Sequence, residues 1–66
     1  MNKNLFKFYA AEHNESLLDV ADILGIGYPA LSSKMNGKSS FKVTEVKILR
    51  QHWSLSLEEI DKIFLL

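Results

Sequence analysis

The stretch LLDVADILGIGYPALSSKMNGK, residues 17–38, decides the fold because it predicts two short helices joined by a tight turn. Apolar residues in its first part recur at the i, i+3, i+4, i+7 spacing of one helical face: Leu17, Val20, Ala21 and Leu24. Gly25 follows, and glycine readily takes the positive φ at which a chain leaves a helix. A first helix is therefore predicted between Ser16, its N-cap, and Gly25.

The second part of this stretch predicts a helix over residues 28–36. Tyr28 and Pro29 open it, with proline at an early position whose N–H would have no helical partner. Leu31 and Met35 form its inward face, and Asn36 with Gly37 ends it. At 100° per residue, this arrangement places Pro29, Ser33 and Asn36 on the outer side, flanked by Ala30 and Ser32.

Three further helices are predicted around this pair. Residues 3–13 carry a wide apolar face. Thr44 is expected to cap a helix over residues 45–53, and Ser56 with Glu59 forms a capping box before a helix over residues 57–66. The prediction is an all-α, compact five-helix domain that occupies residues 1–66 as a single unit.

Composition excludes several classes of protein. The chain has 66 residues and no cysteine, so neither disulfides nor a Cys-based zinc site can reinforce the small core. No apolar run approaches the ~18 residues of a membrane span, and no signal-peptide core is present. His13 and His52 lie far apart in sequence without ligand spacing, so no metal is expected. The sequence also has no glycine-rich phosphate loop and no nucleophilic side chain with a base at a suitable spacing. We therefore expect neither an enzyme nor a cofactor.

The charge is zero in sum but uneven along the chain. Residues 34–50 carry five basic residues against Glu45 alone, whereas residues 1–33 and 51–66 each have an excess of two acidic residues. Three lysines of the basic segment, Lys34, Lys38 and Lys42, are predicted to meet a phosphate backbone. A solvated surface of mixed charge is the alternative interpretation.

Residues 16–38 resemble the helix-turn-helix of the Cro/repressor family of small phage and bacterial transcription regulators. The resemblance rests on A-x-x-x-G-I from Ala21 and on L-x-x-x-x-N-G-K from Leu31. It implies a helix-turn-helix domain of the phage repressor type, with the motif at about residues 16–37 and its second helix presented to DNA. It also implies a transcription regulator that binds double-stranded operator DNA as a homodimer. The expected location is the cytoplasm of a bacterial host cell, in association with the nucleoid.

The resemblance assigns contacts with base edges to the start and outer face of the second motif helix. Phosphate contacts are expected from the start of the first motif helix, through backbone N–H groups, and from the loop over residues 37–43. An ordinary capping role and a simple interhelix loop are the alternatives for these two segments. The complete set of predicted DNA-binding residues is Ser16, Tyr28, Pro29, Ser32, Ser33, Asn36, Lys38, Ser39, Ser40 and Lys42.

A second function is kept open because the outer face of residues 28–36 has few of the side chains that usually read bases. It offers hydroxyls, a proline ring and one asparagine in place of Arg or Gln. The alternative is a modulator or antirepressor that uses the same fold to bind a partner repressor protein. Its interface, or that of a homodimer, is predicted at the aromatic first helix and the apolar C-terminus: Phe6, Tyr9, Ile60, Phe64, Leu65 and Leu66.

Overall fold

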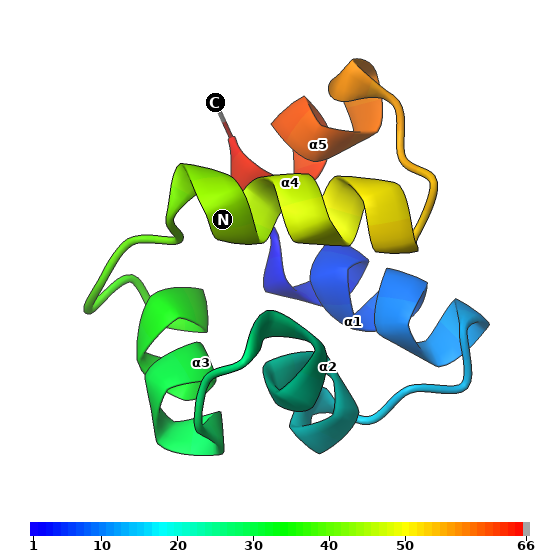
Figure 1. Ribbon diagram of the computed structural model, residues 1–66. Helices are drawn as coiled ribbons and strands as arrows, with labels where there is room; N and C mark the ends of the chain where they lie inside the picture. Colours follow the sequence, from blue (N-terminus) through cyan, green and yellow to red (C-terminus); the bar gives the residue numbers. More distant parts are fainter. Residues whose placement is uncertain (66) are drawn as a thin grey trace.

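The computed structural model describes residues 1–65, which form five α-helices and no strand. The helices are α1 (Lys3–Glu12), α2 (Leu17–Leu24), α3 (Tyr28–Met35), α4 (Val43–His52) and α5 (Leu57–Phe64). The predicted all-α class is therefore confirmed for this part of the chain. In Figure 1, α4 crosses the middle of the molecule, α5 lies above it, and α3 lies at the lower left edge. None of the helices in the described range is long and apolar enough to cross a bilayer.

Local signals fix both ends of α2 and the start of α5 where they were predicted. The Ser16 Oγ accepts a hydrogen bond from the Asp19 N–H, and the Asp19 carboxylate accepts one from the Ser16 N–H at 2.8 Å. Ser56 and Glu59 repeat this reciprocal capping box before α5. Gly25 ends α2 with φ +71°, as its sequence position indicated.

The predicted start of α4 was wrong. The helix begins at Val43, so Thr44 lies inside its first turn and does not cap it. The Glu45 carboxylate accepts a hydrogen bond from the Lys42 N–H at 2.8 Å, which satisfies a free backbone donor without a Ser or Thr cap. Four helices also end earlier than predicted: α1 at Glu12, α3 at Met35, α4 at His52 and α5 at Phe64. In α5 the reason is that Leu65 takes a left-handed φ of +58°.

An aromatic cluster at the centre of the core joins α1 to the C-terminal half. Phe6 is fully buried, and its ring meets Trp53 edge-on at a centroid distance of 5.2 Å. Phe41 and Phe64 contact the same ring from other sides, at 5.9 and 6.4 Å. Arrangements of this kind stabilise beyond the area they bury. The Asn2 N–H also donates to the Ile63 carbonyl at 2.7 Å, which holds the start of the chain against α5.

Helix α3 lies at the periphery of the domain, and two of its side chains are buried in the core. Leu31 is fully buried and Met35 is nearly so, as their spacing predicted. The helix packs chiefly on α2, to which a turn of three residues, 25–27, connects it. Tyr28, Pro29 and Ala30 are exposed, whereas Ser32, Ser33 and Lys34 are half-buried. The accessible surface of α3 therefore lies mainly over its first turn.

Candidate nucleic-acid interface

The outer face of α3 matches the predicted reading face in part. Tyr28 is 44% exposed, and Pro29 and Asn36 are also exposed. Ser32 and Ser33 are only half-buried, so they stand at the margins of this face and do not project from it. The exposed part of α3 thus consists of Tyr28, Pro29 and Ala30 at its start, and the Asn36 amide is exposed just after its end.

The loop after α3 presents four exposed side chains, Lys38, Ser39, Ser40 and Lys42, all of them predicted phosphate contacts. At the start of the loop, in contrast, the backbone N–H groups already form hydrogen bonds within the protein. Gly37 takes φ +78°, which turns the chain so that the N–H groups of Lys38 and Ser39 donate to the Ser33 carbonyl, Lys38 at 2.9 Å. Any phosphate contact from these two residues must therefore come from the lysine ammonium and the serine hydroxyl.

Lys34 does not belong to this basic surface, and its predicted phosphate contact was wrong. Its ammonium lies 2.5 Å from the Glu45 carboxylate, and the two side chains are only 10% and 6% exposed. Burial of the Glu45 carboxyl opposes ionisation, but hydrogen bonds from Lys34 and the Lys42 N–H outweigh it and hold its pKa below the ordinary value. The ion pair joins α3 to α4 and leaves the Lys34 charge neutralised.

The start of α2 differs from the predicted phosphate anchor. The Ser16 N–H already donates to the Asp19 carboxylate, so that donor is not available to a phosphate. Hydrogen bonding to Ser16 also holds the pKa of Asp19 below its usual range, which keeps a negative charge at this helix start. What the segment offers instead is apolar: Leu18 is 62% exposed and borders a shallow hollow with Leu17 and Tyr28.

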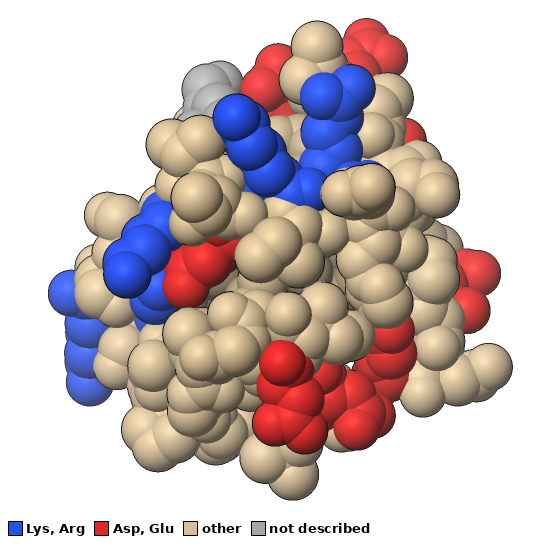
Figure 2. Space-filling view, in the orientation of Figure 1, with Lys and Arg blue, Asp and Glu red and all other residues tan. Residues whose placement is uncertain are grey.

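Basic and acidic side chains gather in different parts of the surface. Figure 2 shows basic side chains over α4 and the loop that follows α3, acidic side chains below them over α2, and further acidic side chains above them over α5. Helix α3 lies between these regions and is itself nearly free of charge at its surface. A polyanion that approaches α3 would therefore meet favourable charge from the loop and not from α2.

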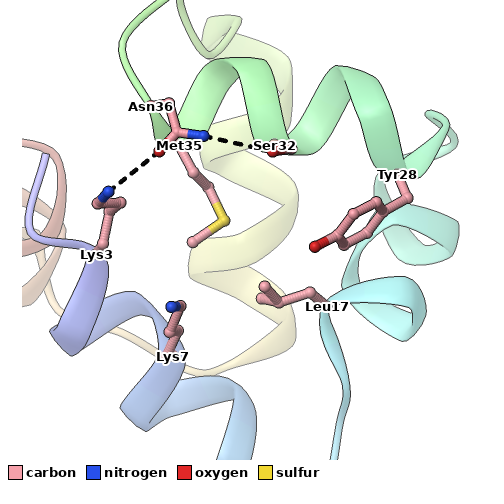
Figure 3. A pocket seen from close by; sticks show the side chains of 7 residues that line it. All are labelled: Lys3, Lys7, Leu17, Tyr28, Ser32, Met35 and Asn36. Carbon is pink, nitrogen blue, oxygen red and sulfur yellow. Dashed lines mark hydrogen bonds between the residues drawn. The ribbon is translucent and has the colours of Figure 1, made fainter.

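Two lysines that were not predicted as site residues complete the surroundings of α3. Lys3 and Lys7 project from α1 toward the C-terminal half of α3, and the Lys3 ammonium donates to the Asn36 side-chain oxygen at 3.1 Å (Figure 3). Their i, i+4 spacing on a helix with a wide apolar face indicated one basic stripe in the sequence. Nothing local indicated that this stripe would face α3.

The predicted protein interface is only partly accessible. Phe6 is fully buried and Ile60 is 4% exposed, so the assignment of both to an interface was wrong because they complete the core. Tyr9 is half-buried, and its hydroxyl donates to the Glu59 carboxylate at 2.7 Å, which raises the pKa of the tyrosine. Phe64 packs against the core, Leu65 is 66% exposed, and Leu66 lies outside the described residues.

The two histidines, distant in sequence, lie side by side. The rings of His13 and His52 have a centroid distance of 6.2 Å, and His52 Nε2 pairs with the Glu15 carboxylate. Trp53 Nε1 donates to the same carboxylate at 2.8 Å. Burial of the Glu15 carboxyl opposes its ionisation, but these hydrogen bonds outweigh burial and lower the pKa of Glu15. The cluster ties the α1–α2 connection to the end of α4, on residues well separated from α3.

Comparison with protein-family models, with curated proteins and with solved structures gives no match to this chain. Its function is therefore inferred from its own residues and geometry.

Proposed function

We propose that the protein is a small transcription regulator that binds operator DNA through α2 and α3, which act as a helix-turn-helix. The observation that supports this most is the exposed outer face of α3, with exposed Lys38 and Lys42 on one side and Lys3 and Lys7 on the other. An exposed helix of this kind fits the major groove, whose width admits one α-helix. The flanking lysines would reach the phosphates on either side.

As a homodimer, the regulator would place two α3 helices about 34 Å apart, one turn of DNA, on a pseudopalindromic operator. Exposed Leu65, beside the partly buried Phe64, is the apolar surface at the end of α5 that supports self-association. The molecular mass of the protein in solution, measured alone and with duplex DNA, tests this part of the proposal.

Removing two loop charges is expected to weaken DNA binding strongly. In the double variant Lys38→Ala and Lys42→Ala, the loss of two phosphate contacts should reduce the slope of log affinity against log salt by about 1.8. Fluorescence titration on the intergenic DNA that flanks the gene, at several salt concentrations, measures this slope. The control, Lys47→Ala with Lys62→Ala, removes the same charge from exposed positions on α4 and α5. An equal decrease in both double variants would contradict a specific role for the loop.

Base reading is expected to depend on thymine methyl groups, because the reading surface is apolar at Leu18 and Tyr28. Replacing each contacted thymine by uracil in a selected high-affinity duplex should weaken binding by about 0.8 kcal/mol, the value of one buried methyl-sized group. Leu18→Ala should abolish this sensitivity, and Leu57→Ala, at a similarly exposed position on α5, should retain it. Unchanged sensitivity in Leu18→Ala would show that Leu18 does not read the bases.

A second candidate function is that of a modulator or antirepressor that binds a partner repressor. It is favoured by the same outer face of α3, which holds no Arg, Lys or Gln at exposed positions and borders the apolar hollow at Leu18. Titration of the flanking DNA with the protein alone and with a candidate partner repressor separates the two functions. Saturable binding by the protein alone supports the regulator, whereas binding only in the presence of the repressor supports the modulator.

A further inference from the structure

A small pocket lies between α1 and α3, on the side of α3 opposite the basic loop. Lys3 and Lys7 form its α1 wall, and Tyr28, Ser32 and Asn36 border it from α3, as Figure 3 shows. Leu17 and Met35 supply apolar surface. Its volume is about 180 Å³, below the roughly 300 Å³ at which pockets for whole small-molecule ligands begin. The space therefore suits one chemical group rather than an entire nucleotide.

The charged side chains around this pocket are all hydrogen-bond donors. Two ammonium groups face it, and no carboxylate lines it among residues 1–65. Lys3 uses one donor on Asn36, and an ammonium group has three. Lys7 forms no ion pair or side-chain hydrogen bond within the described residues, so its charge is uncompensated. The Tyr28 hydroxyl and the Asn36 amide add neutral polar groups.

We propose that this pocket binds a single phosphate group, with Lys7 as the principal ligand. Lysine is a common phosphate ligand as a point charge, and hydroxyl and amide groups complete such sites. Because Tyr28 and Asn36 belong both to the pocket and to the exposed face of α3, the group that fits is a backbone phosphate beside the bases that α3 faces. This source rests on the proposed function; a phosphate on a free small molecule is the other source.

The test uses duplexes in which one phosphate at a time is replaced by an uncharged methylphosphonate. One such replacement per half-site should weaken binding of the wild-type protein about tenfold, the effect of one hydrogen bond to a charged group. Lys7→Ala should weaken binding of the unmodified duplex by a similar factor. The variant should bind the duplex that carries this methylphosphonate no more weakly than it binds the unmodified duplex. Lys7→Arg should retain the wild-type pattern, and Lys62→Ala, which removes an exposed charge on α5, should also retain it.

Titration with inorganic phosphate, followed by the amide NMR signals of Ser32 and Asn36, distinguishes the two sources. Saturable shifts in the wild type that vanish in Lys7→Ala would support a phosphate site in the pocket. If the protein also binds no DNA, the phosphate belongs to a free small molecule, and the proposed function is refuted while the pocket stands. The opposite result is that the protein binds DNA, that Lys7→Ala is as sensitive as the wild type to every methylphosphonate, and that the wild type gives no shift with inorganic phosphate. This result would overturn the pocket and leave the proposed function standing.

Discussion

Phe6→Ala is expected to unfold a large fraction of the protein at 25 °C. Phe6 is fully buried, and its ring contacts those of Trp53, Phe41 and Phe64. Substitutions of buried phenylalanine by alanine cost about 3–5 kcal/mol because transfer energy is lost and a cavity remains. A single core in a chain this short rarely supplies more than about 3–5 kcal/mol of net stability. The loss is therefore comparable with the entire free energy of unfolding.

Phe8→Ala is the matched control, because Phe8 lies on the same helix and is 54% exposed. Urea unfolding followed by circular dichroism should show a midpoint close to that of the wild type for Phe8→Ala. For Phe6→Ala it should show little or no folded baseline. Equal midpoints in the two variants would mean that α1 is not packed through Phe6.

Lys34→Met is expected to destabilise the protein by about 3–5 kcal/mol at pH 7, because it leaves the Glu45 carboxylate buried without its charged partner. Methionine keeps the length and apolar stem of the side chain, so the lost charge dominates. Lys62→Met, on an exposed position of α5, should change the free energy of unfolding by less than about 0.5 kcal/mol.

This cost should depend on pH with a defined sign. The pKa of Glu45 is lowered in the folded protein, so its ionised form stabilises the fold above the unfolded pKa of about 4.3, and this contribution is lost as the pH falls through the folded value. In Lys34→Met, burial is no longer outweighed by the lysine, so the pKa of Glu45 should rise. The difference in unfolding free energy between wild type and variant should therefore shrink between pH 7 and pH 3.

Urea unfolding of both proteins at several pH values measures that difference. Other carboxyls with lowered pKa values, such as Glu15 and Glu59, retain their surroundings in both proteins and contribute equally to the acid transition. A cost of Lys34→Met that stays constant from pH 7 to pH 3 would contradict a role for the charge of Glu45.

Much of the candidate interface was predictable because it depends on helical phase and on short-range chemistry. The spacing of Leu31 and Met35 was sufficient to place Pro29 and Asn36 outside. Ser32 and Ser33 were predicted less well, because neighbouring segments cover part of each: the loop folds back onto the Ser33 carbonyl, and Ser32 borders the pocket beside α1. Whether any of these residues contacts DNA stays a prediction.

The sequence by itself determined the five helices and both ends of α2, since the capping box at Ser16 and the turn at Gly25 involve residues at most three or four positions apart. Only the tertiary structure decided which of Phe6 and Phe8 is buried, that Lys34 is neutralised by Glu45, and that Lys7 faces α3. Periodicity defines the phase of a helix about its own axis. It does not define which distant helix packs against each face, and the partner of a charged side chain depends on that packing.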